Sequence, residues 1–256
     1  MSMDVETFRR DGALRLPGLM AGRLKAFADL SPGGPGTRLQ KPGLELALAP
    51  VTSAARQLIG AGARPVRAVL FDKTANENWA LGWHQDRTIV VRQRREVEGF
   101  GPWSTKQRIL HVAPPVIVVE GMATLRIHLD PCGLDNAPLK VALGSHRIGW
   151  VSAGDAAAQA AEFPRLVCEA AVGDVWAYST PILHASDRAG APSHRRVLQV
   201  DYAAVDLPGG LEWGGVEADT AEERARKRAE DNSEAIADYN RRIRDRGTIG
   251  SEFKRW

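Results

Sequence analysis

The feature that most constrains the fold is a series of short apolar runs in the middle of the chain, most of them rich in β-branched residues. Runs of four to seven residues have the length of β-strands, whereas helices are usually longer. Turns rich in glycine and proline separate them, at residues 99–102, 114–115, 131–133 and 190–192. Many short strands with such turns predict a sandwich or barrel of antiparallel strands. The predicted strands are residues 66–71, 89–92, 116–119, 123–129, 174–178 and 196–202.

The segments on either side of these runs have a helical composition. Asp4 is a typical N-cap for a helix that continues through Arg10 and ends at Asp11-Gly12. The last segment is dense in Ala, Glu and Arg and contains no Pro or Gly. The other predicted helices are residues 21–30, 51–58 and 154–163, and the C-terminal helix or helix pair covers residues 219–246.

Composition excludes several classes of protein. The net charge of +3 comes from 34 basic and 31 acidic residues, which is too balanced to indicate a nucleic-acid partner. Two cysteines, Cys132 and Cys168, provide neither a disulfide framework nor a zinc pattern and favour a reducing compartment. The start of the chain lacks the features of a signal peptide, and no apolar run reaches the ~18 residues of a membrane span. We therefore expect a cytoplasmic protein with no membrane association.

Two of the six histidines have a spacing or position that suits a metal site. His84 and Asp86 are two residues apart, so in a strand both side chains point to the same face. A third ligand would complete the 2-His-1-carboxylate triad, which leaves positions open on Fe(II) for a co-substrate and O2. His184 is the candidate, because it follows the Gly173-Asp174 turn and an apolar strand.

An arginine pair lies eleven residues after His184 and opens the next predicted strand. If that strand returns antiparallel, a guanidinium lies beside the metal pocket, where it could pair with a carboxylate of the co-substrate. Strand alternation allows only one of Arg195 and Arg196 to face inward. The spacing favours Arg195, with Arg196 directed to solvent.

Together these motifs resemble the phytanoyl-CoA dioxygenase family of Fe(II)/2-oxoglutarate oxygenases, over roughly residues 66 to 205. Their order and spacing are more specific than any single motif. One departure is Ala185, where many relatives have glycine. The matching segments are Trp83-His84-Gln85-Asp86, residues 129–141, Gly144-Ser145-His146-Arg147, and residues 173–186 followed by Arg195.

The resemblance implies a double-stranded β-helix, or jelly roll, in a single domain spanning residues 1–256. Its parts would be a helical N-terminal region (1–63), a jelly-roll core (about 64–206) and a helical extension (217–247). The C-terminal helix could support a homodimer or cover the barrel. The implied activity is oxidation of a C–H bond in a small metabolite, with 2-oxoglutarate and O2 consumed and succinate and CO2 released.

The resemblance also assigns roles to individual residues. The iron ligands would be His84, Asp86 and His184. Arg195 would hold the distal carboxylate of 2-oxoglutarate, Ser186 would be its hydroxyl partner, and Gln85 would lie close to the co-substrate. Halogenating relatives replace the carboxylate ligand with a small residue, so the aspartate at position 86 favours hydroxylation.

Four residues are candidates for contact with the substrate or co-substrate. Arg126 and His128 alternate with apolar residues, so they line either the pocket wall or the wet face of a half-exposed strand. Lys73 and Asn78 precede the metal motif and either shape the pocket entrance or belong only to a loop.

The competing function is a non-catalytic jelly roll that binds a metal or a small acid. The sequence does not identify the substrate.

Overall fold

A computed structural model describes residues 3–30, 34, 36–190, 194–217, 233, 236–237 and 240–242. The chain divides into two units, Met1–Glu217 and Ala218–Trp256. Most of the helix predicted at residues 219–246 lies outside the described residues. No helix among the described residues is both long enough and apolar enough to cross a membrane.

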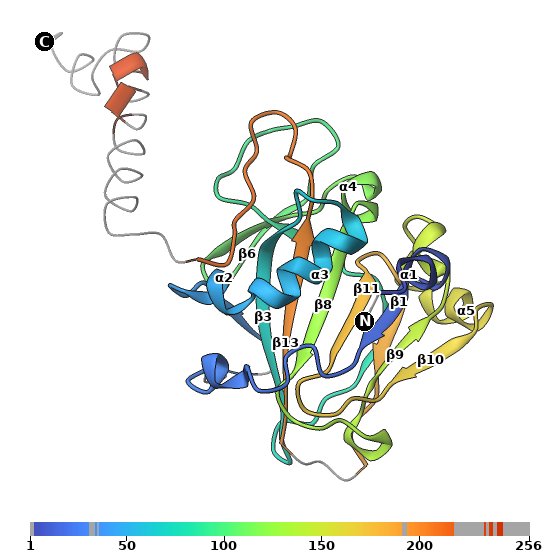
Figure 1. The fold of residues 1–256 in the computed structure, drawn as a ribbon. Helices are drawn as coiled ribbons and strands as arrows, with labels where there is room; N and C mark the ends of the chain where they lie inside the picture. The colour runs from blue at the N-terminus through green and yellow to red at the C-terminus, as the bar shows by residue number, and fades with distance from the viewer. Residues whose placement is uncertain are drawn as a thin grey trace, which may run out of the picture. The chain divides into compact units, whose positions relative to one another are not determined.

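The first unit is built on a sheet of six described strands, all paired antiparallel (Figure 1). Neighbouring strands come from distant parts of the sequence, so the sheet ties the whole unit together. In spatial order the strands are β1 (Ala13–Leu16), β11 (Val175–Ser179), β8 (Met122–His128), β13 (Arg195–Ala203), β3 (Arg64–Lys73) and β2 (Thr37–Leu39).

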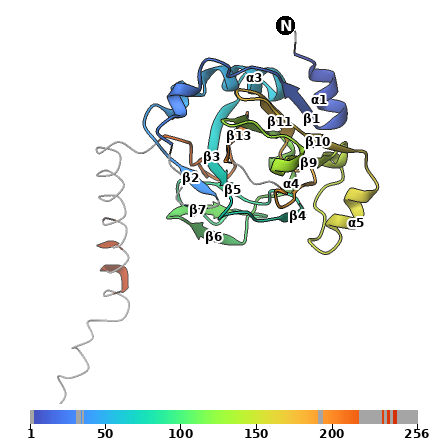
Figure 2. The same ribbon diagram turned by 90° about the horizontal axis from the view of Figure 1, so that it is seen from below.

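Two smaller antiparallel sheets complete the unit, and Figure 2 shows the strands arranged around a barrel. Side chains of β9 and β10 pack with those of β11 in one apolar cluster, so the four-stranded sheet faces the large one. Two facing antiparallel sheets form the jelly roll that was predicted. The four-stranded sheet has the order β10 (Arg165–Cys168), β9 (Leu139–Ala142), β12 (His184–Ser186) and β4 (Leu81–His84), and the three-stranded sheet has β5 (Ile89–Val90), β7 (Ile109–Val112) and β6 (Trp103–Lys106).

Helices cover the outer face of the large sheet. The helices α1 (Val5–Asp11), α2 (Leu44–Ala47) and α3 (Ala49–Ile59) pack on alternate residues of the central strands, which form the largest apolar cluster. Leu125 and Leu198 are fully buried there, and each such side chain contributes roughly 1.5–3 kcal/mol. The strand residues between them point inward, and many of these are polar. The apolar outer face therefore holds the sheet, while the inner face is available for chemistry.

Several sequence predictions are confirmed at residue level. Asp4 caps α1, with its carboxylate accepting from the backbone N–H of Thr7 at 3.0 Å, and Gly12 ends the helix with φ of 76°. A short helix α5 (Ala156–Ala161) lies within the predicted segment 154–163. Gly173 has φ of 85°, and a Cβ there would lie 2.8 Å from the backbone of Ala21, so the turn before β11 requires glycine.

Two predictions about secondary structure are wrong. Residues 116–119 do not form a strand but the helix α4 (Val116–Glu120), which starts directly after Pro114-Pro115. Only one face of this turn is buried, since Val119 is 1% and Ile117 70% exposed. The first 63 residues are also not purely helical, because they supply the edge strands β1 and β2, and residues 21–30 contain only a 3₁₀ turn, Leu24–Phe27. Pairing with the sheet overrides local propensity at these edges.

Candidate metal centre

Three potential metal ligands converge at the edge of the four-stranded sheet. β4 ends at His84 and β12 begins at His184, and the two residues are directly paired across the antiparallel strands. Their ring centroids are 4.2 Å apart. One ligand atom from each of His84, Asp86 and His184 lies within 4.8 Å of the others, and this is the one such cluster found among the described residues.

Both imidazoles are held with one nitrogen free. The Nδ1–H of His84 donates to the carbonyl of Gly82 at 2.7 Å, and that of His184 donates to the carbonyl of Ile182 at 2.9 Å. These bonds orient each ring and leave its Nε2 without a hydrogen-bond partner among the described residues, so this nitrogen is the one available to a metal. Burial, reinforced by the neighbouring His84, lowers the pKa of His184 to about 4, so this ring is neutral at neutral pH.

The carboxylate of Asp86 is held in its charged form. Burial alone would raise its pKa, but Arg67 and the two histidines outweigh that effect and lower the pKa to about 2. Oδ2 accepts from Arg67 at 3.3 Å and from the Gln199 amide at 3.1 Å. No described residue donates to Oδ1, so one carboxylate oxygen is left for a metal ion.

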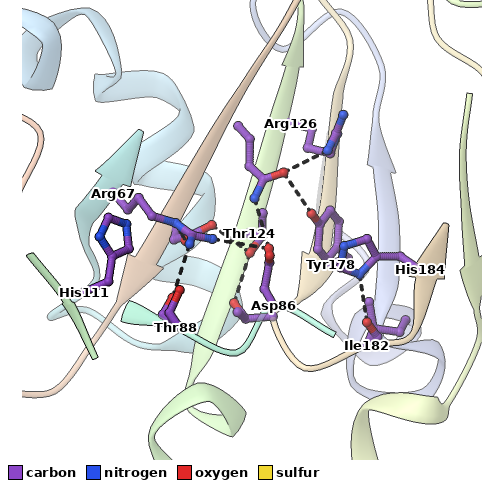
Figure 3. A network of polar contacts seen from close by, with 12 residues as sticks. Arg67, Asp86, Thr88, His111, Thr124, Arg126, Tyr178, Ile182 and His184 are labelled. Carbon is purple, nitrogen blue, oxygen red and sulfur yellow. Dashed lines mark hydrogen bonds and ion pairs between the residues drawn. The ribbon is translucent and has the colours of Figure 1, made fainter. Parts of the chain in front are cut away.

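A polar network on the inner face of the large sheet fixes this carboxylate (Figure 3). The Gln199 Oε1 accepts from Arg126 at 2.8 Å and from the hydroxyl of Tyr178 at 3.3 Å. Its Nε2 donates to Asp86. The amide thus links the candidate ligand to two side chains on neighbouring strands.

The same network contains a buried ion pair. Arg67 pairs with Asp201, which also accepts from the hydroxyl of Thr124 at 3.0 Å. Arg67, Gln199 and Asp201 were not predicted as site residues. For Gln199 and Asp201 the signal is that both share one face of β13 with Arg195 and Val197, opposite the apolar Leu198 and Val200. Arg67, on β3, has no such signal.

The three candidate ligands line a cavity of about 90 Å³. This space corresponds to roughly six to nine waters, which suits a small organic acid. Its charged lining is unbalanced, since three cations face one carboxylate. The remaining lining side chains are partly aromatic and apolar. The lining residues are Phe71, Lys73, Trp79, Leu81, His84, Asp86, Arg126, Leu139, His184, Ala185, Ser186, Arg195 and Gln199.

Arg195 reaches this cavity and its neighbour does not. Arg195 is 3% exposed and donates through Nη1 to the carbonyl of Ala137, which also accepts from the hydroxyl of Ser186 at 3.1 Å. The Nε of Arg195 is buried and has no hydrogen-bond acceptor among the described residues. Arg196 lies on the opposite face and binds Asp130 through two hydrogen bonds of 2.9 Å. The predicted choice between the two arginines therefore agrees with the structure.

Lys73 lies directly opposite Arg195 on the adjacent strand. Its ammonium donates to the Ser186 hydroxyl at 3.1 Å and to the Asp187 carbonyl at 2.7 Å. Burial, followed by repulsion from Arg195 and Arg126, lowers the pKa of Lys73 to about 8. Such crowding of cations indicates that the cavity accommodates an anion.

The other two candidate residues, Arg126 and His128, lie on the inner face of β8 but differ in their relation to the cavity. Arg126 lines the cavity, and its buried Nε has no acceptor among the described residues. His128 is buried on the same face but does not line the cavity, and its Nδ1 has no partner among the described residues. Burial and the nearby arginines lower its pKa to about 3. Neither residue is on a wet face, contrary to that alternative.

Gln85 and Asn78 are committed to structural contacts outside this cavity. Gln85 donates to the carbonyls of Gly149 and Pro181, both at 2.8 Å, and accepts from the Val151 N–H at 2.9 Å. Asn78 exchanges two hydrogen bonds with the backbone of Ala189. Gln85 does not line this cavity and its amide holds a loop, so its place beside the co-substrate stays a prediction. Asn78 corresponds to the loop-only alternative.

Similar folds occur among solved structures. No protein-family model matches the chain, and no curated protein matches it in sequence. The non-haem α-ketoglutarate-dependent carbocyclase SnoK from nogalamycin biosynthesis is 16% identical over 84% of this chain and 88% of its own, with a TM-score of 0.57. EctD from S. alaskensis is 20% identical over 84% and 80%, with a TM-score of 0.56. HygX from Streptomyces hygroscopicus, solved with nickel and 2-oxoglutarate, is 17% identical over 87% and 94%, with a TM-score of 0.53.

At these identities the similarity establishes the fold. The chain has the jelly-roll fold of these proteins, and it covers most of the length of each. Within that fold it carries a cluster of two histidines and one aspartate at the mouth of a cationic cavity.

Proposed function

We propose that this chain is an Fe(II)- and 2-oxoglutarate-dependent oxygenase of the phytanoyl-CoA dioxygenase type, acting on a small-molecule substrate. One observation carries the proposal. Two imidazoles and a carboxylate converge at a cavity that also presents the guanidinium of Arg195, the ammonium of Lys73 and the hydroxyl of Ser186. This donor set suits a non-haem iron with open positions, whereas a closed structural zinc site uses four protein ligands.

The residues present fit the metal. His84 and His184 each have an available Nε2, and Asp86 has an available Oδ1. When bound there, Fe(II) would supply the activation of O2 that oxidises a C–H bond as 2-oxoglutarate is converted to succinate and CO2. The contribution of the chain is to orient both rings through their Nδ1–H groups and to hold the carboxylate in place through Arg67 and Gln199.

The residues also fit the co-substrate. A dicarboxylate needs a cation beyond the metal, and Arg195 has a buried Nε available for a side-on pair. Ser186 and Lys73 lie next to it and would complete the carboxylate site. Arg126, also with an unused Nε, adds a second guanidinium to the cavity wall. A neutral ligand would leave these three cations uncompensated in a buried site.

Hydroxylation is the reaction outcome that we infer. Asp86 leaves no small residue at the carboxylate position to admit a halide. Neighbours of the same fold include a carbocyclase and an epimerase, SnoK and SnoN, so the outcome depends on how the substrate is presented to the metal.

Two measurements test the proposal. The purified chain, supplied with Fe(II), 2-oxoglutarate and ascorbate, should release succinate, and His84→Ala should abolish this release and weaken Ni(II) binding. The matched control is His194→Ala, because this half-exposed histidine pairs with Asp72 at 2.8 Å outside the cluster. Binding of Ni(II) and 2-oxoglutarate without succinate would indicate a non-catalytic protein instead. Equal Ni(II) affinity in wild type and His84→Ala would refute the metal site.

A further inference from the structure

A second cavity, of about 300 Å³, adjoins the first at the candidate metal ligand. Phe71, Asp86 and Gln199 line both spaces. Its remaining walls come from strands β2 and β3 of the large sheet, from strand β6 and from the segment after β4. The second cavity therefore reaches the metal centre from the side of Asp86, and the co-substrate residues Arg195 and Ser186 belong only to the first.

Four cations line this second cavity, against the single carboxylate of Asp86. Arg67 is neutralised by its buried pairing with Asp201. Arg38, Arg87 and Lys106 have no carboxylate partner among the described residues. A bound divalent metal would in addition neutralise Asp86, so the cavity carries an excess of positive charge.

These cations are close enough to affect one another. Burial and then repulsion from Arg38 and Arg67 lower the pKa of Lys106. Burial and then Arg67 lower the pKa of Arg38. Cations on an ordinary solvated face spread apart, whereas here they are held together around one concave space. An anion would remove the repulsion.

The guanidinium of Arg38 is positioned in advance. Its Nε donates to the Nε2 of His111 at 3.1 Å, and the Nδ1–H of His111 donates to the Ile109 carbonyl at 2.8 Å. Burial lowers the pKa of His111 to about 4, so the ring is the neutral acceptor that this arrangement requires. The backbone N–H of Arg38 also donates to the side chain of Gln107 at 2.8 Å, which ties β2 to the β6–β7 turn.

A second cation of the cavity is also constrained. The guanidinium of Arg87 lies over the ring of Trp150, 5.1 Å from its centroid. This stacking limits its motion although the residue is exposed. Arg38 and Arg87 thus come from two different segments of the chain, and each has a contact that restricts its guanidinium. Pre-positioned donors reduce the entropy cost of binding a ligand.

We propose that the second cavity binds the primary substrate and that this substrate carries an oxyanion, a carboxylate or a phosphate, held by Arg38 and Lys106. The assignment rests on the proposed function, because it is Asp86 that connects this cavity to the reacting centre. The oxyanion lies at the cationic end, and the carbon to be oxidised extends toward Asp86. Arg87 adds a further donor at the rim.

The test uses inorganic phosphate and acetate as probes on the metal-free protein, followed by heteronuclear NMR. Saturable shifts are expected at Thr88 and Lys106, which belong to the second cavity, whether or not Ala185 and Ser186, which belong to the likewise cationic first cavity, also shift. Arg38→Gln and Lys106→Gln should each weaken binding of the preferred probe about tenfold, the loss of a charge-assisted hydrogen bond. The matched control is Arg9→Gln, an exposed arginine on α1 paired with Glu6, which should bind as wild type does.

The outcomes separate the alternatives. Tighter binding of phosphate indicates a phosphorylated substrate, and tighter binding of acetate indicates a carboxylate. The proposal is overturned if neither probe saturates, if the shifts fall at Ala185 and Ser186 instead, or if Arg9→Gln weakens binding equally. Because no metal or 2-oxoglutarate is present, failure here leaves the succinate assay to judge the proposed function independently.

Discussion

The neighbouring arginines Arg195 and Arg196 allow the co-substrate site to be tested within one pair of variants. Arg195 is buried in the cavity, with Nη1 on the Ala137 carbonyl and with Nε and Nη2 free of acceptors among the described residues. A carboxylate bound to these two atoms would gain two charge-assisted hydrogen bonds of about 1.5 kcal/mol each. Arg195→Met should therefore raise the Kd for 2-oxoglutarate about 100-fold.

The same substitution should leave the stability of the metal-free protein unchanged or higher. Burial and the charge of Arg126 lower the pKa of Arg195, which shows that the folded protein disfavours this cation. Replacing such a buried charge with an apolar side chain of similar length is often neutral or stabilising. The Ala137 carbonyl keeps its hydrogen bond from Ser186.

Arg196→Met is the matched control and should behave in the opposite way. It removes the pairing with Asp130 on the outer face and should lower the unfolding free energy by about 1 kcal/mol, without changing the Kd. Calorimetric titration of the Ni(II)-loaded proteins with 2-oxoglutarate, together with urea unfolding of the metal-free proteins, measures both quantities. Equal affinities of the two variants for 2-oxoglutarate, or a raised Kd only in Arg196→Met, would refute the assignment of Arg195 to the carboxylate of 2-oxoglutarate.

Three further outcomes are expected. Gln85→Ala removes three hydrogen bonds to backbone groups, so it should lower the free energy of unfolding in urea by about 3 kcal/mol without altering the Kd for 2-oxoglutarate. A higher Kd with unchanged stability would contradict the structural role of Gln85. Arg67→Met leaves the buried carboxyl group of Asp201 without its cation and should cost about 3–5 kcal/mol, whereas the double variant with Asp201→Asn should recover most of that loss. An equally unstable double variant would mean that the unpaired carboxyl group is not the cause. The pKa values of His111 and His128 are lowered to about 4 and about 3, mainly by burial, against about 6.5 in the unfolded chain. Unfolding therefore takes up protons below pH 6.5, and each histidine should lower the free energy of unfolding by about 1.4 kcal/mol per pH unit as the pH falls toward 4. The measurement is the free energy of unfolding against pH for wild type and for the double variant His111→Gln/His128→Gln. Equal slopes in the two proteins would exclude this contribution.

Prediction from sequence succeeded where the signal was local. The spacing of His84 and Asp86 predicted that the two side chains converge, which they do together with His184, and the capped helix at residues 5–11 was recognised from Asp4 and Gly12. Strand alternation separated Arg195 from Arg196, because adjacent side chains of a strand point to opposite faces. Each of these inferences needs only the geometry of a few consecutive residues.

Prediction failed where a pattern was ambiguous or where pairing with distant strands decided the structure. The apolar run at residues 116–119 has the composition of a strand, yet it forms a helical turn after Pro114-Pro115. Gln85 lies between two candidate ligands in sequence, but its amide binds the loop near Gly149. Nothing in the local sequence states which of these contacts a side chain will make.

The sequence by itself determined the class of fold, the three candidate ligands and the inward arginine. Only the tertiary structure joined Arg67, Gln199 and Asp201 into the network that holds Asp86, and only it gathered Arg38 and Lys106 around a second cavity. The physical reason is the range of the interactions involved. Spacing within a strand is set by backbone geometry, whereas a cavity forms from strands that become neighbours only after the sheets have paired and packed.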